Sequence, residues 1–188
     1  TKSRIFVAYA MNMNRTLTIR TFSRFLFFLL IVNACTNTSN LYTWAEVDRL
    51  IVKEFPNIPQ LTTSELETLL SNHKNEVILL DARESNEFAI SHLKGAHLVE
   101  SEIEALTIID DSPANAVIVA YCSVGYRSAE LVEGLQDRGF SNTINLQGSL
   151  FKWANEGRPV YKGNEIVKSV HPYNQKWGTL LNKELWSF

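Results

Sequence analysis

Short apolar runs alternate with amphipathic segments along most of this chain. Apolar runs at 77–80 and 116–121 predict buried strands, because a strand covered on both faces carries apolar residues at successive positions. Shorter strands are expected at 96–99 and 143–146, and helical spacing of apolar residues predicts helices at 66–70, 85–90, 102–106, 128–138 and 149–156. Strands that alternate with helices predict an α/β fold with a mainly parallel sheet and right-handed crossovers.

The segment 42–57 precedes this alternation and predicts an accessory helix. Thr43 and Glu46 have the spacing of a capping box, and apolar residues follow at near-helical spacing. The helix either packs on the domain or lies near a membrane surface. Its acids Glu46, Asp48 and Glu54 favour packing, because helices that lie on membranes are usually basic.

The segment 1–34 predicts an export signal, with translation expected to start at Met11 or Met13. An apolar block at 25–32 follows basic residues. It is too short to span a membrane, which takes about 20 residues, but it suits the apolar region of a secretory signal. The small polar stretch 35–41 then predicts a flexible tether.

The end of this signal resembles the lipobox of bacterial lipoproteins. Val32-Asn33-Ala34-Cys35 carries the resemblance, which implies cleavage before Cys35 and acylation of that cysteine. A plain cleaved signal and an uncleaved anchor helix are the alternatives. We therefore expect an exported protein, anchored to a membrane by the lipid or the signal and facing the periplasm or the cell exterior.

Composition and charge limit the class of partner. With 45% apolar and 11% aromatic residues, the 188-residue chain has the composition of a globular protein. The first 45 residues hold five basic residues and no acid, so the remainder carries 13 basic and 20 acidic residues, a net charge of −7. We expect no nucleic-acid partner, because clustered Lys and Arg supply most of that affinity.

Cys122 stands where the strand at 116–121 ends and a helix is about to begin. Ligands of parallel sheets bind beyond the carboxyl ends of the strands, and the free N–H groups at a helix start favour an anion such as a thiolate. An inert core cysteine is the alternative. If Cys35 is lipidated, Cys122 is the only free thiol and no internal disulfide can form.

Three ordered motifs resemble those of rhodanese-like domains. Asp-Ala-Arg-Glu-Ser-Asn-Glu-Phe stands at 81–88 ahead of His-Leu-Lys-Gly-Ala-His at 92–97, and Cys-Ser-Val-Gly-Tyr-Arg-Ser-Ala stands at 122–129. The closing motif consists of Gly139, Phe140, Leu146, Gln147, Gly148, Ser149 and Trp153. The resemblance covers 58–161 and leaves 162–188 as a C-terminal extension, whose aromatic residues predict that it folds back. Ser91 and Ser149 replace usual glycines and are expected to affect local packing only.

The resemblance implies a three-layer domain of about five strands with helices on both faces, and a sulfur-transfer chemistry. Rhodanese-like enzymes move a sulfane sulfur from a donor such as thiosulfate onto a cysteine, and then to an acceptor such as cyanide or a thiol. Cys122 is then the nucleophile, and the covalent persulfide takes the place of a cofactor. The substrate-binding loop comprises Ser123, Val124, Gly125, Tyr126 and Arg127, whose amides converge on the anion.

Loop length separates two chemistries within this family. Cys-x4-Arg goes with sulfur transfer, whereas Cys-x5-Arg goes with phosphatase or arsenate reductase activity, because the larger oxyanion needs a wider cradle. Four residues separate Cys122 from Arg127, which favours sulfur. A persulfide-carrying or sensing module for a partner protein, without turnover, remains an alternative, and a phosphatase or arsenate reductase is the less favoured one.

The supporting residues have more than one interpretation. Arg127 either binds the sulfonate end of the donor or turns outward to a carboxylate. Asp81 and Arg83 follow a strand end and pair with each other, or with Glu84, to brace the site. His92 is expected to be a hydrogen-bonded structural histidine rather than a proton donor. No residue spacing typical of a metal site is evident in the sequence.

Overall fold

The computed structural model describes residues 42–72, 77–113 and 115–188. The predicted signal segment 1–34, the tether 35–41 and the lipidation site Cys35 lie outside the described residues. Across the described ranges, no helix has the length and apolar character needed to cross a membrane.

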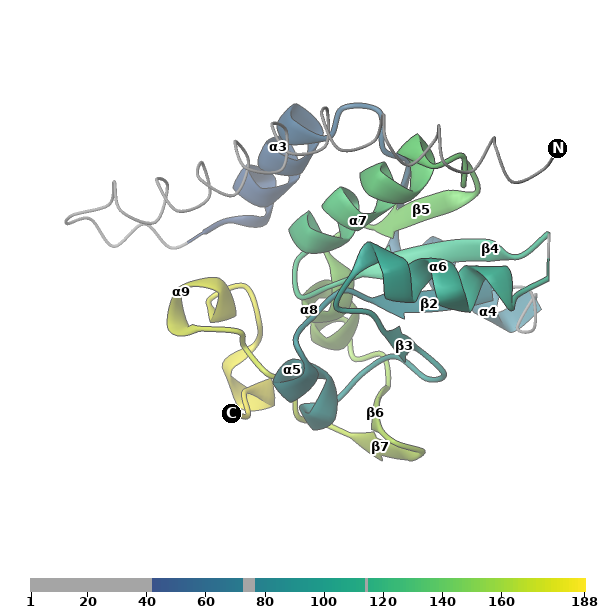
Figure 1. Cartoon of the computed structure of the whole chain (residues 1–188). Helices are drawn as coiled ribbons and strands as arrows, with labels where there is room; N and C mark the ends of the chain where they lie inside the picture. The colour runs from purple at the N-terminus through teal and green to yellow at the C-terminus, as the bar shows by residue number, and fades with distance from the viewer. Residues whose placement is uncertain (1–41, 73–76, 114) are drawn as a thin grey trace, which may run out of the picture. The chain divides into compact units, whose positions relative to one another are not determined.

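A five-stranded parallel sheet forms the centre of the domain, in the order β1-β5-β4-β2-β3 (Figure 1). The strands are β1 Gln60–Leu61, β2 Val77–Asp81, β3 His97–Leu98, β4 Val117–Tyr121 and β5 Thr143–Leu146. The predicted α/β fold with about five mainly parallel strands is therefore confirmed. The edge strand β1 was not expected, because two residues are too few to show a periodicity.

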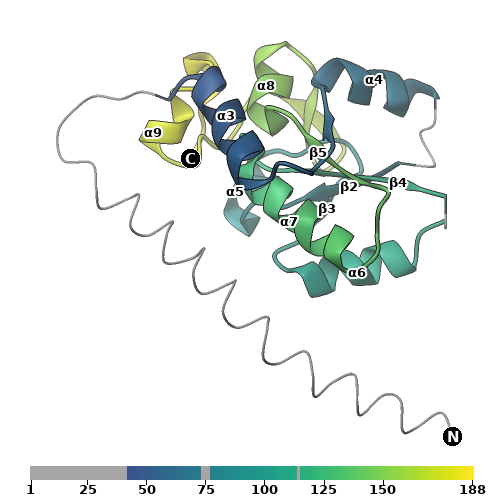
Figure 2. The ribbon, with the colours of Figure 1, turned by 90° about the horizontal axis from the view of Figure 1, so that it is seen from above.

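Helices cover both faces of the sheet, which gives three layers (Figure 2). One face carries α3 Trp44–Glu54, α6 Glu102–Asp110 and α7 Tyr126–Asp137, and the other carries α4 Thr63–Asn72 and α8 Ser149–Asn155. The short helix α5, Ser85–Ile90, lies beyond the carboxyl ends of the strands. Helix α7 begins two residues before its expected start, so Tyr126 and Arg127 belong to its first turn.

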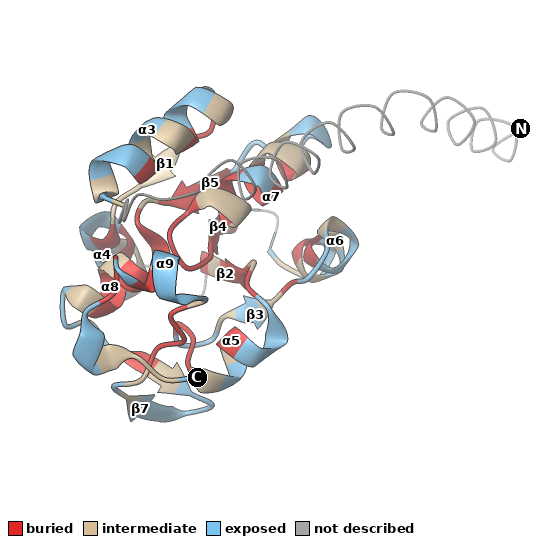
Figure 3. Cartoon of the chain, turned by 90° about the vertical axis from the view of Figure 1, so that its left-hand side faces the viewer, coloured by how far each residue is buried: buried red, intermediate tan, exposed pale blue. Residues whose placement is uncertain are grey.

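The hydrophobic core lies between the sheet and the two helical layers, as the buried residues of the central strands show (Figure 3). Ile118, Val119 and Ala120 of β4 are all buried, because α7 covers one face of this strand and the opposite helical layer covers the other. A continuous apolar run is what a doubly covered strand requires. This burial fixes the end of β4, and with it the position of Cys122.

Both segments that flank the matched domain pack onto it. Helix α3 forms the predicted capping box between Thr43 and Glu46 and buries Val47 and Ile51, so the packed alternative is the one observed. The C-terminal residues fold back as predicted, with Val170, Leu180 and Leu181 in the same core.

The C-terminal extension is also joined to the body by hydrogen bonds. The Asn155 side chain, at the end of α8, donates to the Leu180 carbonyl (2.7 Å) and accepts from the Asn182 N–H (2.8 Å). The elements after α8 are the antiparallel hairpin β6 Val160–Lys162 and β7 Glu165–Val167, helix α9 Gln175–Gly178 and the 3-10 turn Lys183–Leu185. The expected boundary between 161 and 162 falls inside β6.

Candidate active site

The loop that follows β4 turns its carbonyl groups toward helix α8. The Cys122 carbonyl accepts from the Leu150 N–H (3.1 Å), and the Ser123 carbonyl accepts from the Phe151 N–H (3.0 Å). These donors lie in the first turn of α8, where backbone N–H groups have no partner within the helix. Because these two carbonyls point to α8, away from the sulfur, N–H groups of the loop can point toward the Cys122 sulfur.

Ser149 holds the backbone of Cys122 from the other side. Its hydroxyl accepts from the Cys122 N–H (3.0 Å) and donates to the Leu146 carbonyl (3.1 Å). Ser149 does so at a φ of 51°, in the left-handed region that usually favours glycine. Ser149 was expected to affect local packing only, and its observed contact is with the backbone of Cys122.

Polar groups converge on the Cys122 sulfur, which is buried with 1% of the residue exposed. The Gly125 N–H donates to Sγ (3.1 Å), in a turn where Gly125 adopts a φ of 108°. Burial raises the pKa of the Cys122 thiol, but the Arg127 charge and hydrogen bonds from Ser128 and Gly125 outweigh burial and lower the pKa below its ordinary value. The site therefore favours the thiolate, the reactive form.

Asn145 of β5 hydrogen-bonds two of the residues that donate to the Cys122 sulfur, Ser128 and Gly125. Its side-chain oxygen accepts from the Ser128 hydroxyl (2.6 Å), and its amide nitrogen donates to the Gly125 carbonyl (3.1 Å) and to the Gln60 side chain (2.9 Å). These three bonds fix the orientation of the buried amide. The Ser128 hydroxyl has one proton and two acceptors, the Asn145 oxygen and the Cys122 sulfur.

Glu87 of α5 binds the loop through a buried carboxylate. It accepts from the Ser123 hydroxyl (2.7 Å), from the Glu84 N–H (3.1 Å) and from both terminal nitrogens of Arg127 (2.8 and 3.1 Å). Burial raises the pKa of the Glu87 carboxyl, but the bonds from Arg127 and Ser123 outweigh burial and lower its pKa. Arg127 thus faces an interior carboxylate, and its charge still acts on Cys122.

Asp81 and Arg83 form a second ion pair, with 0% of either side chain exposed. The Arg83 guanidinium donates to both Asp81 oxygens (2.7 and 2.9 Å) and to the Ser91 carbonyl (2.6 Å) at the end of α5. Of the two partners predicted for Arg83, the structure shows Asp81. The pair attaches α5, and therefore Glu87, to the end of β2.

The side chains of three other predicted site residues make contacts of a structural kind. The Val124 side chain belongs to the hydrophobic core, and the Tyr126 ring packs edge-on against Phe55. His92 stacks on Phe88 (4.2 Å between ring centroids), and its Nδ1 hydrogen-bonds the Leu93 carbonyl (2.9 Å). These contacts agree with a structural histidine.

Sequence reasoning did not select four residues that touch this site: Glu87, Ser128, Asn145 and Tyr173. Glu87 belongs to the motif at 81–88, but the sequence assigned it no role. Ser128 belongs to the motif at 122–129 and directly follows Arg127, the last residue of the predicted loop. Asn145 had a signal of its own, because it is a polar residue between the two apolar residues Ile144 and Leu146 of a strand. Tyr173, which lies over Arg127 with 4.9 Å from the guanidinium carbon to the ring centroid, carried none.

Comparison with known proteins identifies the family. A profile described as Rhodanese-like domain matches residues 62–156, half of the 188-residue chain. The chain belongs to the rhodanese-like domain family. The matched stretch contains Cys122, Arg127, Ser128 and Glu87, and it ends before the C-terminal extension that carries Tyr173.

Sulfurtransferases are among the relatives of this rhodanese-like protein. The probable adenylyltransferase/sulfurtransferase MoeZ of Mycobacterium tuberculosis is 33% identical over 100 residues, which cover 53% of this chain and 25% of MoeZ. The chain therefore matches about a quarter of the length of that relative. The thiosulfate:glutathione sulfurtransferase of Saccharomyces cerevisiae is 25% identical over 117 residues, which cover 56% of this chain and 84% of the yeast protein.

The rhodanese-like fold is also found among solved structures. Thiosulfate sulfurtransferase from Pseudomonas aeruginosa superposes with a TM-score of 0.54 and 23% identity, over 61% of this chain and 22% of that chain. At this identity the likeness shows the fold. Within the described ranges of the rhodanese-like chain, no cluster of three or more His, Cys, Asp or Glu side chains has the arrangement of a metal site.

The lowered thiol pKa predicts a measurable pH profile. Alkylation of Cys122 by iodoacetamide, followed by mass spectrometry of its peptide, should have a midpoint below about 8.5, the ordinary cysteine value. Ser128→Ala keeps the Ser128 N–H but removes the hydroxyl, whose one proton serves the Asn145 oxygen and the Cys122 sulfur, and should raise this midpoint. The rate at pH 7 should fall by up to roughly fivefold, because such a bond contributes about 1 kcal/mol.

A matched control for this profile is Ser141→Ala, which changes an exposed serine beyond α7. The control should keep the wild-type profile. A wild-type alkylation midpoint at or above that of free cysteine would contradict the stabilisation of the thiolate by Gly125, Ser128 and Arg127.

Proposed function

We propose that this protein is a sulfurtransferase that carries a sulfane sulfur as a persulfide on Cys122. In the first step the Cys122 thiolate attacks the outer sulfur of thiosulfate. The bond between the two thiosulfate sulfurs breaks, and its electron pair leaves with sulfite. In the second step an acceptor such as cyanide attacks the terminal persulfide sulfur, and the electron pair of the broken S–S bond returns to Cys122 as thiolate.

The single observation that carries this proposal is the set of donors on the Cys122 sulfur. The Gly125 N–H, Ser128 and the Arg127 charge stabilise a negative charge at this position. The same donors suit the terminal sulfur of a persulfide anion, which lies one bond farther out. Preorganised donors that receive a developing charge are the usual means by which enzymes lower such barriers.

The loop length favours sulfur over phosphate in this proposal. Four residues lie between Cys122 and Arg127, and Arg127 is bound by Glu87. Glu87 offsets part of the positive charge that Arg127 could offer to any dianion, thiosulfate or phosphoryl, so the preference for sulfur rests on the loop length. Thiosulfate as donor and a thiol as acceptor are supported by the thiosulfate:glutathione sulfurtransferase of yeast, and the MoeZ relative in Mycobacterium supports sulfur transfer in general.

The proposed setting of the reaction rests on the N-terminal sequence. The apolar block at 25–32 and Cys35 support export, with a lipid or signal anchor that holds the domain at a membrane. In that setting the acceptor is a small thiol, cyanide or a partner protein outside the cytoplasm. Acylation of Cys35 is measured by the intact mass of the protein from its native host.

The test of the proposed function is sulfur loading followed by turnover. Protein treated with thiosulfate should gain about 32 Da on the Cys122 peptide, the mass of one sulfur atom. Addition of cyanide should remove this mass and release thiocyanate over many cycles. Cys122→Ser, which keeps the size of the side chain, should show neither the adduct nor thiocyanate.

Each alternative has its own outcome in the same assay. Loading on Cys122 without turnover to any acceptor would support a persulfide-carrying or sensing module. Hydrolysis of an aryl phosphate that is lost in Cys122→Ser would support a phosphatase. Wild-type protein that is not loaded by thiosulfate or by other sulfane donors would sink the sulfur-transfer proposal.

A further inference from the structure

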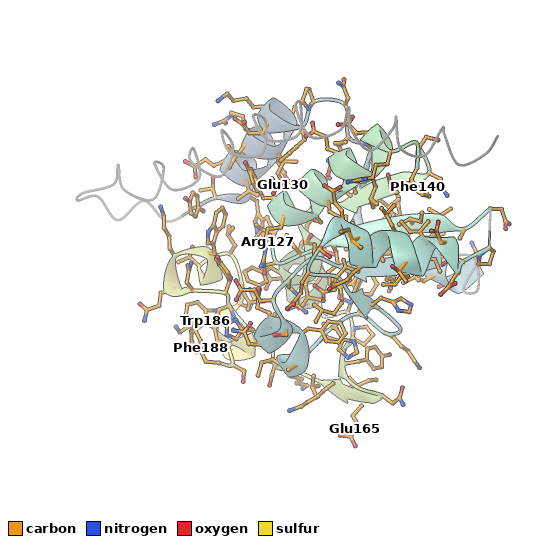
Figure 4. All side chains as sticks on the ribbon, in the orientation of Figure 1. Arg127, Glu130, Phe140, Glu165, Trp186 and Phe188 are labelled. Atoms are coloured by element: carbon orange, nitrogen blue, oxygen red, sulfur yellow. The ribbon has the colours of Figure 1, made fainter. Side chains whose placement is uncertain are left out.

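Solvent reaches the Cys122 loop on one side. Among residues 122–127, only Tyr126 and Arg127 have partly exposed side chains, and 29% of the Arg127 side chain is exposed. Figure 4 shows Arg127 at the start of α7, on the side of the molecule where the C-terminal residues Trp186 and Phe188 lie. The open side of the loop is therefore the side of Arg127 and Tyr126.

Each of these two side chains is covered by one of the flanking segments. The Phe55 ring, which follows α3, contacts the Tyr126 ring edge-on, with centroids 5.2 Å apart. The Tyr173 ring, in the C-terminal extension, lies against the Arg127 guanidinium at 4.9 Å. Neither Phe55 nor Tyr173 belongs to the stretch that the family profile matches.

The two flanking segments also contact each other. Tyr42, which precedes α3, stacks on Trp177 of α9, with centroids 4.1 Å apart and planes 14° apart. The Lys176 ammonium lies over the same Tyr42 ring, 4.4 Å from its centroid. We define Tyr42, Phe55, Tyr173 and Trp177 as the aromatic collar. Figures 1 and 3 show α9 beyond the carboxyl ends of the strands, the edge where the Cys122 loop lies.

The position of Tyr173 is fixed by its surroundings. Its φ of 62° lies in the left-handed region, which is unfavourable for a bulky residue and persists only where neighbouring contacts impose it. The Tyr173 N–H donates to Nδ1 of the buried His171 (3.1 Å), and the next N–H, of Asn174, donates to the Pro172 carbonyl (2.8 Å). This turn holds the ring over Arg127.

We propose that Tyr173 determines which substrates reach Cys122, by narrowing the mouth of the site to small sulfur donors and acceptors. The inference rests on the proposed sulfur transfer and adds the substrate class. We expect ions of the size of thiosulfate and cyanide to pass beside Arg127, and larger acceptors such as glutathione or a protein thiol to be slowed by the Tyr173 ring. Tyr173 is a specificity-determining residue and takes no part in the bond changes.

The test compares two electrophiles of different size on the Cys122 peptide. The ratio of alkylation rates for a fluorescein maleimide and iodoacetamide, each normalised to free cysteine, should be low in the wild-type protein. Tyr173→Gly removes the ring and suits the positive φ, so the fold is kept. The ratio should rise at least roughly tenfold, the scale on which pocket size discriminates between substrates.

Two further variants separate the ring from other effects. Tyr173→Phe keeps the ring and should keep the wild-type ratio. Ile166→Ala, an exposed residue of the same extension, should also leave the ratio unchanged. An unchanged ratio in Tyr173→Gly, or an equal rise in Ile166→Ala, would overturn the proposal.

A parallel measurement of sulfur transfer keeps the two proposals distinguishable. With loaded enzyme, Tyr173→Gly should raise the kcat/KM for glutathione relative to that for cyanide by a similar factor. One outcome is that no donor loads Cys122 while the alkylation ratio responds to Tyr173→Gly. The proposed role of Tyr173 is then supported, and the sulfur-transfer proposal fails. If sulfur transfer proceeds but Tyr173→Gly changes neither the alkylation ratio nor the kcat/KM ratio, only the proposed role of Tyr173 fails.

Discussion

Replacing Glu87 by glutamine should lower the free energy of unfolding by about 3 kcal/mol, because it leaves a largely enclosed arginine without its counter-charge. The wild-type carboxylate is fully buried and accepts from Arg127, Ser123 and the Glu84 N–H. An amide has one acceptor oxygen, so at least one of these donors loses its partner, and the new N–H groups face other donors. Urea unfolding measures the loss.

The same variant has a second, less obvious expectation. The Arg127 charge contributes to lowering the Cys122 pKa, and Glu87 neutralises part of that charge. Glu87→Gln should therefore keep the alkylation midpoint of Cys122 below the ordinary value despite the loss of stability. Sulfur transfer should fall by a factor of about 100, since misplacement of a loop by even 1 Å has effects of this size.

A matched control for Glu87→Gln is Glu165→Gln at the exposed start of β7, where Figure 4 shows the side chain pointing outward. Its stability and activity should match the wild type. If Glu87→Gln were as stable as Glu165→Gln, the buried carboxylate would not support the loop in the way inferred from its contacts.

Asp81→Asn should be the most destabilising of the substitutions considered, at about 3 to 5 kcal/mol, the usual cost of removing one partner from a buried ion pair. Arg83 would keep its charge with 0% of its side chain exposed, but an amide has only one acceptor oxygen for the guanidinium nitrogens that now bind both carboxylate oxygens. The Tyr121 hydroxyl, which is hydrogen-bonded to Asp81, would lose a carboxylate acceptor as well.

A double-mutant cycle checks that the pair, and not the fold in general, is responsible. Asp81→Asn combined with Arg83→Met removes both charges and should be less destabilised than the two single variants added together. Additive losses would contradict a direct interaction. The Ser91 carbonyl still loses its donor in the double variant, so recovery is expected to be partial.

The sequence was sufficient for the layers of the fold and for the position of Cys122 at the end of a central strand. The apolar runs that became β2 and β4 are continuous because both faces are covered, and four residues between Cys122 and Arg127 defined the loop. The two residues of β1 showed no such pattern. Their pairing with β5 depends on a register that local sequence does not encode.

The partners of the loop were harder to predict, because they come from distant parts of the chain. Glu87 and Arg127 are 40 positions apart in the chain. Their contact depends on how α5 packs against the Cys122 loop, and no local sequence pattern specifies that packing. Tyr173 lies outside every motif, and its contact with Arg127 depends on how the extension folds back. Asn145 was the exception, because a polar residue within a buried strand already requires a polar partner.

The pairing of β1 with β5 also has a consequence for the order of folding. Gln60 and Asn145 are 85 positions apart in the chain, so their bond closes a long loop and forms only after most of the domain has been synthesised. Asn145 in turn holds Ser128 and Gly125, the donors to the sulfur. The bond that fixes the Asn145 amide, and with it the position of these donors, is therefore completed only when the edge of the sheet closes.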